Sequence, residues 1–401
     1  MLGRLLAGYR AFFSLPDVTR LVVMALVARM PLGTQGLALL LHVRALTGSF
    51  AVAGFTVGTY LAAAAVTAPM LGRIVDRIGP RKPLLVTGVV CPLALLALLA
   101  AGPLQLTPTW IYLAAAIAGA FAPPITVLTR TMWRHRFDRD AEAQRTAFAV
   151  DSVLVELAFT LGPALVALLI AVADPTAAFA MAIVFAALAV PVFLASPAMR
   201  YWKLDASAER HLLGPLAAPR LLVVYAVTSL LTMSLGLLEV GYPGHATAAG
   251  ATALSGVLLA VNSTGSAIGG LAYGGLRVSM AVEAQLRWSL LLLALAMAAQ
   301  TFVAGLMALA GLAFVAGFFI APSLTAVTML TAAHAPARYA TEAFTWSATC
   351  IVTGIGVGMA VGGHLVERFD ARAVFIASAA AALAAAVIAL ALRQPRAADA
   401  Q

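Results

Sequence analysis

The sequence predicts an all-α membrane protein with twelve transmembrane helices in two pseudo-symmetric six-helix bundles. Its 401 residues are 63% hydrophobic and only 10% charged, whereas about a quarter of the residues in a typical soluble domain are charged. The apolar residues gather in twelve runs, each of about 20 residues, the length that an α-helix needs to cross a bilayer. The motif F-A-P-P at residues 121–124 returns as F-I-A-P at residues 319–322, which indicates two related halves.

The predicted spans follow one another with mostly short connections. The ninth and tenth spans are separated by almost nothing, so their shared boundary is the least defined. The twelve spans are expected at residues 18–41, 50–71, 84–102, 109–131, 147–172, 176–196, 221–243, 252–276, 288–305, 307–331, 342–365 and 372–393.

Positive charges indicate how these spans are oriented. With both termini in the cytoplasm, 21 of the 25 Lys and Arg residues fall on the cytoplasmic side, three fall outside and Arg29 lies within the first span. Because cytoplasmic loops are enriched in Lys and Arg, we expect a multi-pass protein of the plasma membrane, here the bacterial inner membrane, with both termini cytoplasmic. This topology explains the net charge of +9 without a nucleic-acid partner. Residues 1–17 are interpreted as a cytoplasmic lead-in rather than a cleaved signal peptide.

The longest polar segment separates the two predicted halves. We expect an N-terminal bundle over residues 1–196, a cytoplasmic linker over 197–220 and a C-terminal bundle over 221–401. A second pair of related sequences, T-A-F at residues 146–148 and E-A-F at residues 342–344, is also displaced by nearly 200 residues. Two related halves favour a substrate site between them, near the middle of the membrane.

A short basic hairpin, residues 72–82 with the sequence G-R-I-V-D-R-I-G-P-R-K, joins the second and third spans. The stretch resembles the signature loop of the major facilitator superfamily, which follows that family's second helix and has the form G-x-x-x-D-R-x-G with basic residues after it. Pro80 departs from the pattern, since the family usually has its first basic residue there. The alternative is an ordinary cytoplasmic loop. The matching residues are Gly72, Asp76, Arg77 and Gly79, followed by the basic Arg81 and Lys82.

The resemblance implies a twelve-span transporter that works by alternating access, with this loop as its gating motif. We expect Gly72 to let two helix ends approach closely and Gly79 to permit the sharp reversal of the chain. The hypothesis for Asp76 is that it holds the two halves together on the cytoplasmic side. In the fifth span, Gly162 and Pro163 are similar to the Gly-Pro end of a motif found in the superfamily's antiporters, although the earlier glycines of that motif are absent.

Arg29 lies about 11 residues into the first span, near mid-depth at a rise of about 1.5 Å per residue. An ionisable group inside a span is costly and is therefore a functional candidate. Pro31 and Gly33 follow it and are expected to interrupt the helix, which would free backbone groups to face a cavity. We interpret Arg29 and Gln35 as candidates for binding substrate or protons. The alternative is a structural arginine in a salt bridge between helices.

Glu156 lies about nine residues into the fifth span, at a depth similar to that of Arg29. It is a candidate proton carrier unless it pairs with Arg29, in which case it is structural, and both interpretations stay open. Asp151 lies nearer the cytoplasmic end of the same helix, about 140° away around the helix axis. We expect Asp151 to pair with one of the nearby arginines.

Glu239 lies in the outer third of the seventh span, between Gly236 and Gly241. No cation in its own or the adjacent loops is an evident partner, so this acid is a candidate for binding a cation or a proton. Glu342, in contrast, begins the eleventh span, where an acid suits the positive end of a helix.

Enzyme chemistry has little support in this sequence. There is no Gly-rich phosphate loop with a following Lys and Ser or Thr, and the six histidines are scattered along the chain. Cys91 and Cys350 both fall inside apolar runs, so neither a disulfide framework nor a thiol metal site is indicated. We expect no catalytic site, no cofactor and no metal.

The function that we expect is secondary active transport, driven by protons, with a monomer in the lipid bilayer acting on a small-molecule substrate. Few charges inside the spans, and Phe314, Phe318 and Phe319 in the tenth span, favour efflux of lipophilic or amphipathic compounds. One alternative is uptake or export of a small polar metabolite, such as a sugar, an amino acid or an organic acid. Another is a non-transporting membrane receptor or scaffold, although no long extramembrane domain is evident.

Overall fold

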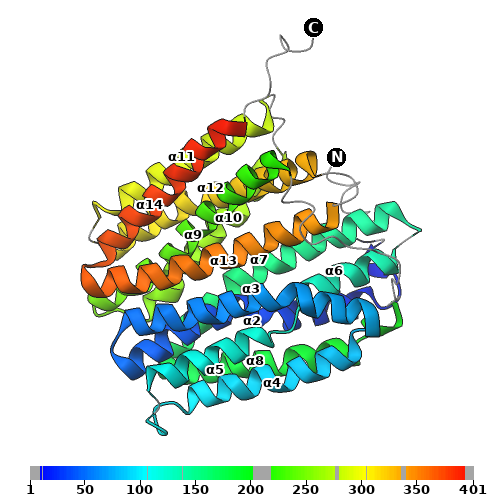
Figure 1. Ribbon diagram of the computed structural model, residues 1–401, viewed down its shortest axis with the longest axis horizontal. Helices are drawn as coiled ribbons and strands as arrows, with labels where there is room; N and C mark the ends of the chain where they lie inside the picture. The colour runs from blue at the N-terminus through cyan, green and yellow to red at the C-terminus, as the bar shows by residue number, and fades with distance from the viewer. Residues whose placement is uncertain are drawn as a thin grey trace. The chain divides into compact units, whose positions relative to one another are not determined.

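The computed structural model describes residues 10, 12–105, 107–137, 139–201, 218–275, 280–303, 305–335 and 340–392. These residues form helices and connecting segments, without a strand (Figure 1). Within them, twelve helical segments are long and apolar enough to cross a membrane, and α5 and α6 together form the fourth of these. The α-helices are α2 Val18–Thr47, α3 Phe50–Ile78, α4 Arg81–Leu99, α5 Pro108–Ala120, α6 Ile125–Arg136, α7 Ala141–Val172, α8 Pro175–Ala195, α9 Pro219–Ala248, α10 Leu254–Gly275, α11 Val282–Gln300, α12 Leu306–His334, α13 Ala340–Arg368 and α14 Ala371–Ile388.

Packing divides the chain into two units. Unit 1 comprises Met1–His42 and Val66–Ala208, and unit 2 comprises Val43–Ala65 and Glu209–Gln401. The end of α2 and the first half of α3 therefore pack with the helices of unit 2, which the sequence did not predict. The predicted domains at 1–196 and 221–401, with their linker, stay a prediction, and most of that linker lies outside the described residues.

Carboxylate caps explain where three of the helices begin. Asp140, Asp174 and Asp370 each precede a helix, and each accepts a hydrogen bond from the backbone N–H three residues further on, at 3.0, 2.8 and 3.0 Å. These bonds satisfy donors that a helix leaves free in its first turn, and the negative charge suits the positive end of the helix dipole. The starts of α7, α8 and α14 are thus encoded locally.

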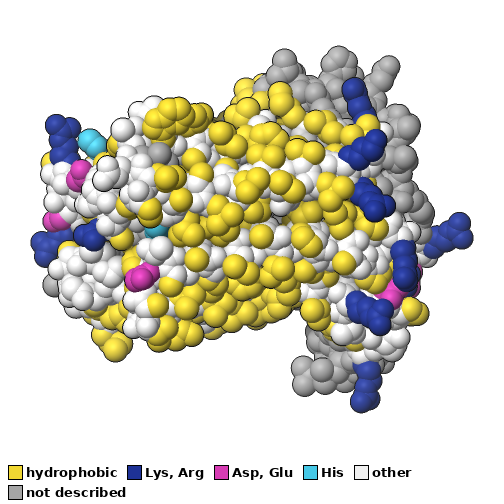
Figure 2. All heavy atoms as spheres, turned by 90° about the horizontal axis from the view of Figure 1, so that it is seen from below, with side chains coloured by type: hydrophobic (Ala, Val, Ile, Leu, Met, Phe, Trp, Pro, Cys, Tyr) yellow, Lys and Arg dark blue, Asp and Glu magenta, His cyan; other side chains and the backbone are white. Residues whose placement is uncertain are grey.

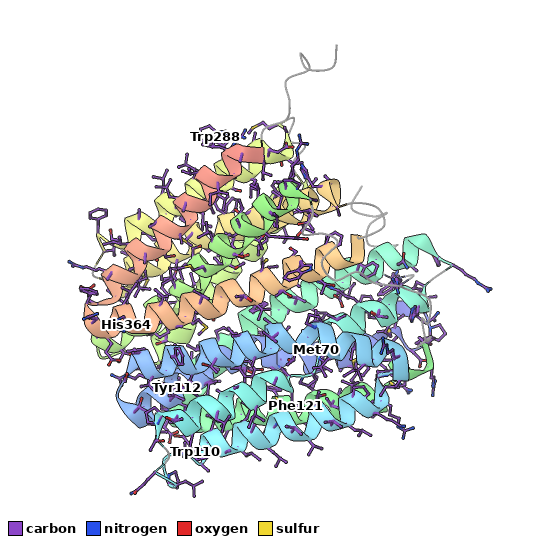
Figure 3. The ribbon with its side chains drawn as sticks, in the orientation of Figure 1. Met70, Trp110, Tyr112, Phe121, Trp288 and His364 are labelled. Carbon is purple, nitrogen blue, oxygen red and sulfur yellow. The ribbon has the colours of Figure 1, made fainter. Side chains whose placement is uncertain are left out.

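The fourth span, predicted at residues 109–131, consists of two helices. Helix α5 ends at Ala120 and α6 starts at Ile125, with Phe121 labelled at the break in Figure 3. Pro123 and Pro124 supply no backbone N–H, and each disfavours helical geometry at the residue before it, so two in succession stop the helix. The related motif in the second half has a single proline, Pro322, which lies inside the continuous helix α12.

The ninth span begins and ends earlier than predicted. Helix α11 starts at Val282 rather than near residue 288, so Glu283 lies in its first turn, where an acid suits the helix dipole. The helix ends at Gln300, and α12 begins at Leu306. The connection between the ninth and tenth spans is therefore longer than the apolar pattern suggested.

The surface agrees with a membrane-spanning protein. On the face drawn in Figure 2, hydrophobic side chains cover the middle, and Lys and Arg side chains gather toward the ends of the helices. Large apolar residues such as Val66, Leu168 and Leu271 are more than half exposed. A wide apolar surface of this kind is costly in water and suits contact with lipid tails.

Candidate functional site

The basic hairpin between α3 and α4 is as tight as the sequence predicted. Helix α3 ends at Ile78 and α4 begins at Arg81, and Gly79 has a φ of +81°, a conformation that glycine adopts without steric cost. The N–H of Gly79 donates to the carbonyl of Val75 at 2.8 Å, which closes the last turn of α3. The predicted chain reversal at Gly79 is therefore confirmed, and its part in a gating motif stays a prediction.

Gly72 has a different environment from the one predicted. A Cβ atom at this position would meet nothing within 4 Å among the described residues. No described helix therefore comes close enough to Gly72 to require a glycine there. Arg77, Arg81 and Lys82 are exposed at this end. The side chain of Asp76 lies outside the described part of the structure, so its gating role stays a prediction.

A buried ion cluster lies inside unit 1, built from α2, α6 and α7. The Nη2 of Arg29 donates to Oδ1 of Asp151, and the two side chains are 0% and 1% exposed. The Nε of Arg130 donates to Oδ2 of the same carboxylate at 3.1 Å, while the side chain of Arg130 is 54% exposed. One carboxylate thus bridges a fully buried guanidinium and one that reaches the surface.

The partner of Arg29 differs from the one proposed for it. Pairing with Glu156 was one of two open interpretations, whereas the structure pairs Arg29 with Asp151. The pairing of Asp151 with a nearby arginine, Arg130, agrees with the sequence. The side chain of Glu156 is outside the described residues, and its candidacy as a proton carrier stays a prediction.

Helix α2 is continuous from Val18 to Thr47 with Pro31 inside it, which corrects the expected interruption after Arg29. Gly33 instead contacts α7, because a Cβ at Gly33 would lie 3.2 Å from the Cα of Gly162. A Cβ at Gly162 would come within 2.6 Å of the Cα of Gly33. The two glycines let the backbones touch, and Gly162 therefore has a packing role beside Pro163, which lies within α7.

The same helix carries Gln35 on a different face from Arg29. Gln35 and His42 are seven residues apart, so they share a face of α2. His42 stacks on Phe179 of α8, with ring centroids 4.9 Å apart, whereas Gly33 faces α7. Both amide atoms of Gln35 are buried without a hydrogen-bond partner among the described residues. The structure therefore separates two candidates that the sequence grouped.

Glu239 lies in α9, and it is half-buried. Its flanking glycines pack against other helices: a Cβ at Gly236 would lie 2.8 Å from the Cα of Ile355 in α13, and one at Gly241 would lie 2.9 Å from the Phe375 ring in α14. Within the described part of the chain, no hydrogen bond or ion pair of the Glu239 carboxylate is found. The structure thus gives this acid no compensating cation there.

Two acids are more important in the structure than the sequence indicated. Asp151 was placed near a loop, although it binds Arg29, whose side chain is fully buried. Glu367 was not singled out, yet its carboxylate accepts a hydrogen bond from the backbone N–H of Ala51 at 2.8 Å. Its position could have signalled a role, because an acid at a helix C-terminus opposes the helix dipole.

No cluster of three potential metal ligands occurs among the described residues.

Comparisons with known proteins agree with this architecture. Residues 21–299 match the family model described as Major Facilitator Superfamily. No curated protein matches the chain. A crystal structure of the nucleoside transporter NupG superimposes with a TM-score of 0.74 at 15% identity, over 95% of this chain and 100% of that one. A point mutant of NupG gives a TM-score of 0.77 at 14% identity, over 94% of this chain and 99% of that one.

The likeness to NupG at this identity shows the fold. The family match is independent of it and extends over more than half of the sequence. It includes the basic hairpin, the buried ion cluster and Glu239. The protein therefore belongs to the Major Facilitator Superfamily.

Proposed function

We propose that this chain is a secondary transporter that moves a small polar solute across the bacterial inner membrane by alternating access. The observation that carries the proposal is the likeness, over nearly the whole chain, to structures of a protein described as a nucleoside transporter. This favours the polar-metabolite alternative over the efflux of lipophilic compounds. It is a carrier rather than an enzyme, and it works as a monomer with both termini in the cytoplasm.

Buried polar groups support a polar substrate. The Nε and Nη1 of Arg29 and both amide atoms of Gln35 are buried, and none has a hydrogen-bond partner among the described residues. Buried donors and acceptors are nearly always paired in proteins, so bound water or the polar groups of a solute would complete their bonding. Lipophilic compounds alone would leave these buried groups without partners.

Protons are the proposed driving ion, and Glu239 is the proposed carrier. Its carboxylate is half-buried in a span, without a cation among the described residues. A group of this kind can take up a proton on one side of the membrane and release it on the other. Arg29 and Asp151, which neutralise each other, hold α2 and α7 together instead.

A flux screen in proteoliposomes tests this proposal. Accumulation of labelled nucleosides, sugars and amino acids would be measured with and without an inward proton gradient, beside lipophilic cations. Gradient-driven accumulation of one polar class is expected, with Glu239→Gln as the uncoupled reference. Transport of lipophilic cations alone would support the competing proposal of drug export, which the edge-to-face pair Phe318 and Phe319 in α12 could serve.

A further inference from the structure

His42 is buried near the C-terminal end of α2, inside unit 1. The residue is 4% exposed, and its ring stacks on that of Phe179 in α8, with centroids 4.9 Å apart and planes 20° from parallel. Neither ring nitrogen has a hydrogen-bond partner among the described residues. His42 therefore packs as an aromatic core residue, although an imidazole can take up a proton near neutral pH.

The surroundings of the ring offer little to pair with a charge. The carbonyl of Leu98, at the end of α4, lies beside the ring, but it already accepts from the N–H of Ala101 at 3.2 Å. The carboxylate whose charge reaches the ring is that of Asp174, which is exposed and caps its own helix by accepting from a backbone N–H at 2.8 Å. A neutral imidazole fits this site. An imidazolium would be a buried cation with two N–H donors and no carboxylate in contact among the described residues.

The other titratable groups near His42 face elsewhere. On α2, Arg44 comes two residues later, and its guanidinium lies over the ring of Phe50, 5.3 Å from the centroid. On α4, the buried Cys91 lies about two turns further from the ring than Leu98. The sequence of α8 holds no acid or base after its cap. No other described group is therefore placed to neutralise a proton on His42.

The same face of α2 holds a second polar side chain without partners. Gln35 is 3% exposed, and neither of its amide atoms has a hydrogen-bond partner among the described residues. Ala38, between Gln35 and His42, is fully buried. The packing of α2 also changes directly after His42, since residues from Val43 onward belong to unit 2. His42 is thus the last residue of α2 that packs in unit 1, at the end of a polar face that water would solvate if it opened.

From this geometry we propose that His42 is a proton-binding site of unit 1, and that its protonation separates the end of α2 from α8. The imidazolium leaves the Phe179 ring and turns toward Asp174 and water, because burial of an unpaired charge costs more than its stacking on a ring returns. Water then reaches Gln35 along the opened face. The site is separate from Glu239, the proposed proton carrier, which lies in unit 2. Acidity thus changes the conformation of unit 1 independently of coupling.

The accessibility of a thiol beside His42 tests the proposal without any substrate. The reporter is Ala38→Cys in a protein that lacks Cys91 and Cys350, reacted in lipid nanodiscs with a pyridyl disulfide, which modifies thiols at acidic as well as neutral pH. Each rate is divided by that of a reference thiol, Leu104→Cys, at a residue that is 62% exposed. On acidification from about pH 8 to about pH 5.5 this ratio should rise by about tenfold, well within the limit of about tenfold per pH unit that a single proton sets.

His42→Phe is the decisive variant. Phenylalanine keeps a ring on Phe179 but takes up no proton, so the ratio should stay at its neutral-pH value in acid. His364→Gln is the matched control, because His364 is an exposed histidine near the end of α13 (Figure 3), and the full rise should remain. The proposal is wrong if acid leaves the ratio unchanged in the protein with His42. It is equally wrong if the ratio rises as much in His42→Phe.

Asp174→Asn tests where the charged ring goes. The amide oxygen of asparagine can still cap α8, but the negative charge is gone, so the rise in acid should be several-fold smaller. A rise as large as in the original protein would reject Asp174 as the acceptor of the imidazolium.

Thermal unfolding gives a second readout that needs no cysteine in the core. On acidification the melting temperature of the protein with His42 should fall further than that of His42→Phe, because the unfolded chain binds a proton that the buried ring does not. Equal falls in the two proteins would contradict the proposal. Neither measurement involves transport, so this site and the proposed function can fail separately.

Discussion

The guanidinium of Arg29 and the carboxylate of Asp151 form an ion pair in the interior of unit 1, with side chains 0% and 1% exposed. Their residues lie on α2 and α7, which also touch through Gly33 and Gly162. The ion pair and the glycine contact are one turn apart on α2, on nearly the same face. Charge and packing therefore hold the same two helices together.

Removal of one partner of this pair should destabilise the protein strongly. Arg29→Ala leaves the buried Asp151 carboxylate with only the half-exposed Arg130 as a partner, at a cost of up to about 3–5 kcal/mol of the free energy of unfolding. Arg130→Ala should cost less than about 1 kcal/mol, because its side chain is 54% exposed and water replaces the lost partner. Thermal unfolding in detergent would compare the two variants.

The double variant Arg29→Met with Asp151→Leu is the control for this prediction. It removes both charges together, and its stability should recover to near the original value or above. A double variant as unstable as Arg29→Ala would show that packing by the long arginine side chain, and not the buried charge, accounts for the loss.

Replacement of Gly162 tests the glycine contact. Gly162→Ala puts a Cβ where only 2.6 Å separates it from the Cα of Gly33, so α2 and α7 must move apart. We expect a loss of about 1–3 kcal/mol in stability, the usual cost of overpacking. Gly311→Ala in α12 is the matched control, since nothing lies within 4 Å of that position. It should be neutral or gain up to about 1 kcal/mol, because alanine is the better helix former.

Glu239→Gln should abolish proton-driven accumulation and retain downhill exchange of substrate. The amide keeps the size and hydrogen-bonding capacity of the side chain but cannot exchange a proton. Glu283→Gln, in the first turn of α11, should keep full coupling. A Glu239→Gln protein that still couples, beside a well-folded Glu156→Gln protein that does not, would move the proton site to unit 1.

Asp76→Asn tests the predicted gate in the basic hairpin. Loss of the negative charge should impair transport several-fold while expression stays near normal. The reason is that the hypothesis gives Asp76 a contact that holds the two halves together during the transport cycle, rather than a role in packing the core. Flux in proteoliposomes, normalised to the amount of protein, provides the comparison. Unchanged flux would leave Gly79 with a structural role in the turn and Asp76 with no role in gating.

The number of spans followed from sequence alone. A helix in a bilayer satisfies its own backbone hydrogen bonds, so a run of about 20 apolar residues is a sufficient signal wherever it occurs. Gly79 between two spans likewise identified a reversal that its φ of +81° confirms. These features depend on residues close together in the chain.

Tertiary structure decided which residues meet. Arg29 pairs with Asp151, and residues 43–65 pack with unit 2, although nothing in the order of the residues indicates either. Gly54 and Gly33 face other backbones, whereas Gly72, the first glycine of the signature loop, faces none among the described residues. The physical reason is that partner choice depends on how each helix is rotated and how closely two axes approach. In a nearly uniform apolar sequence, hydrophobic periodicity carries little of that information.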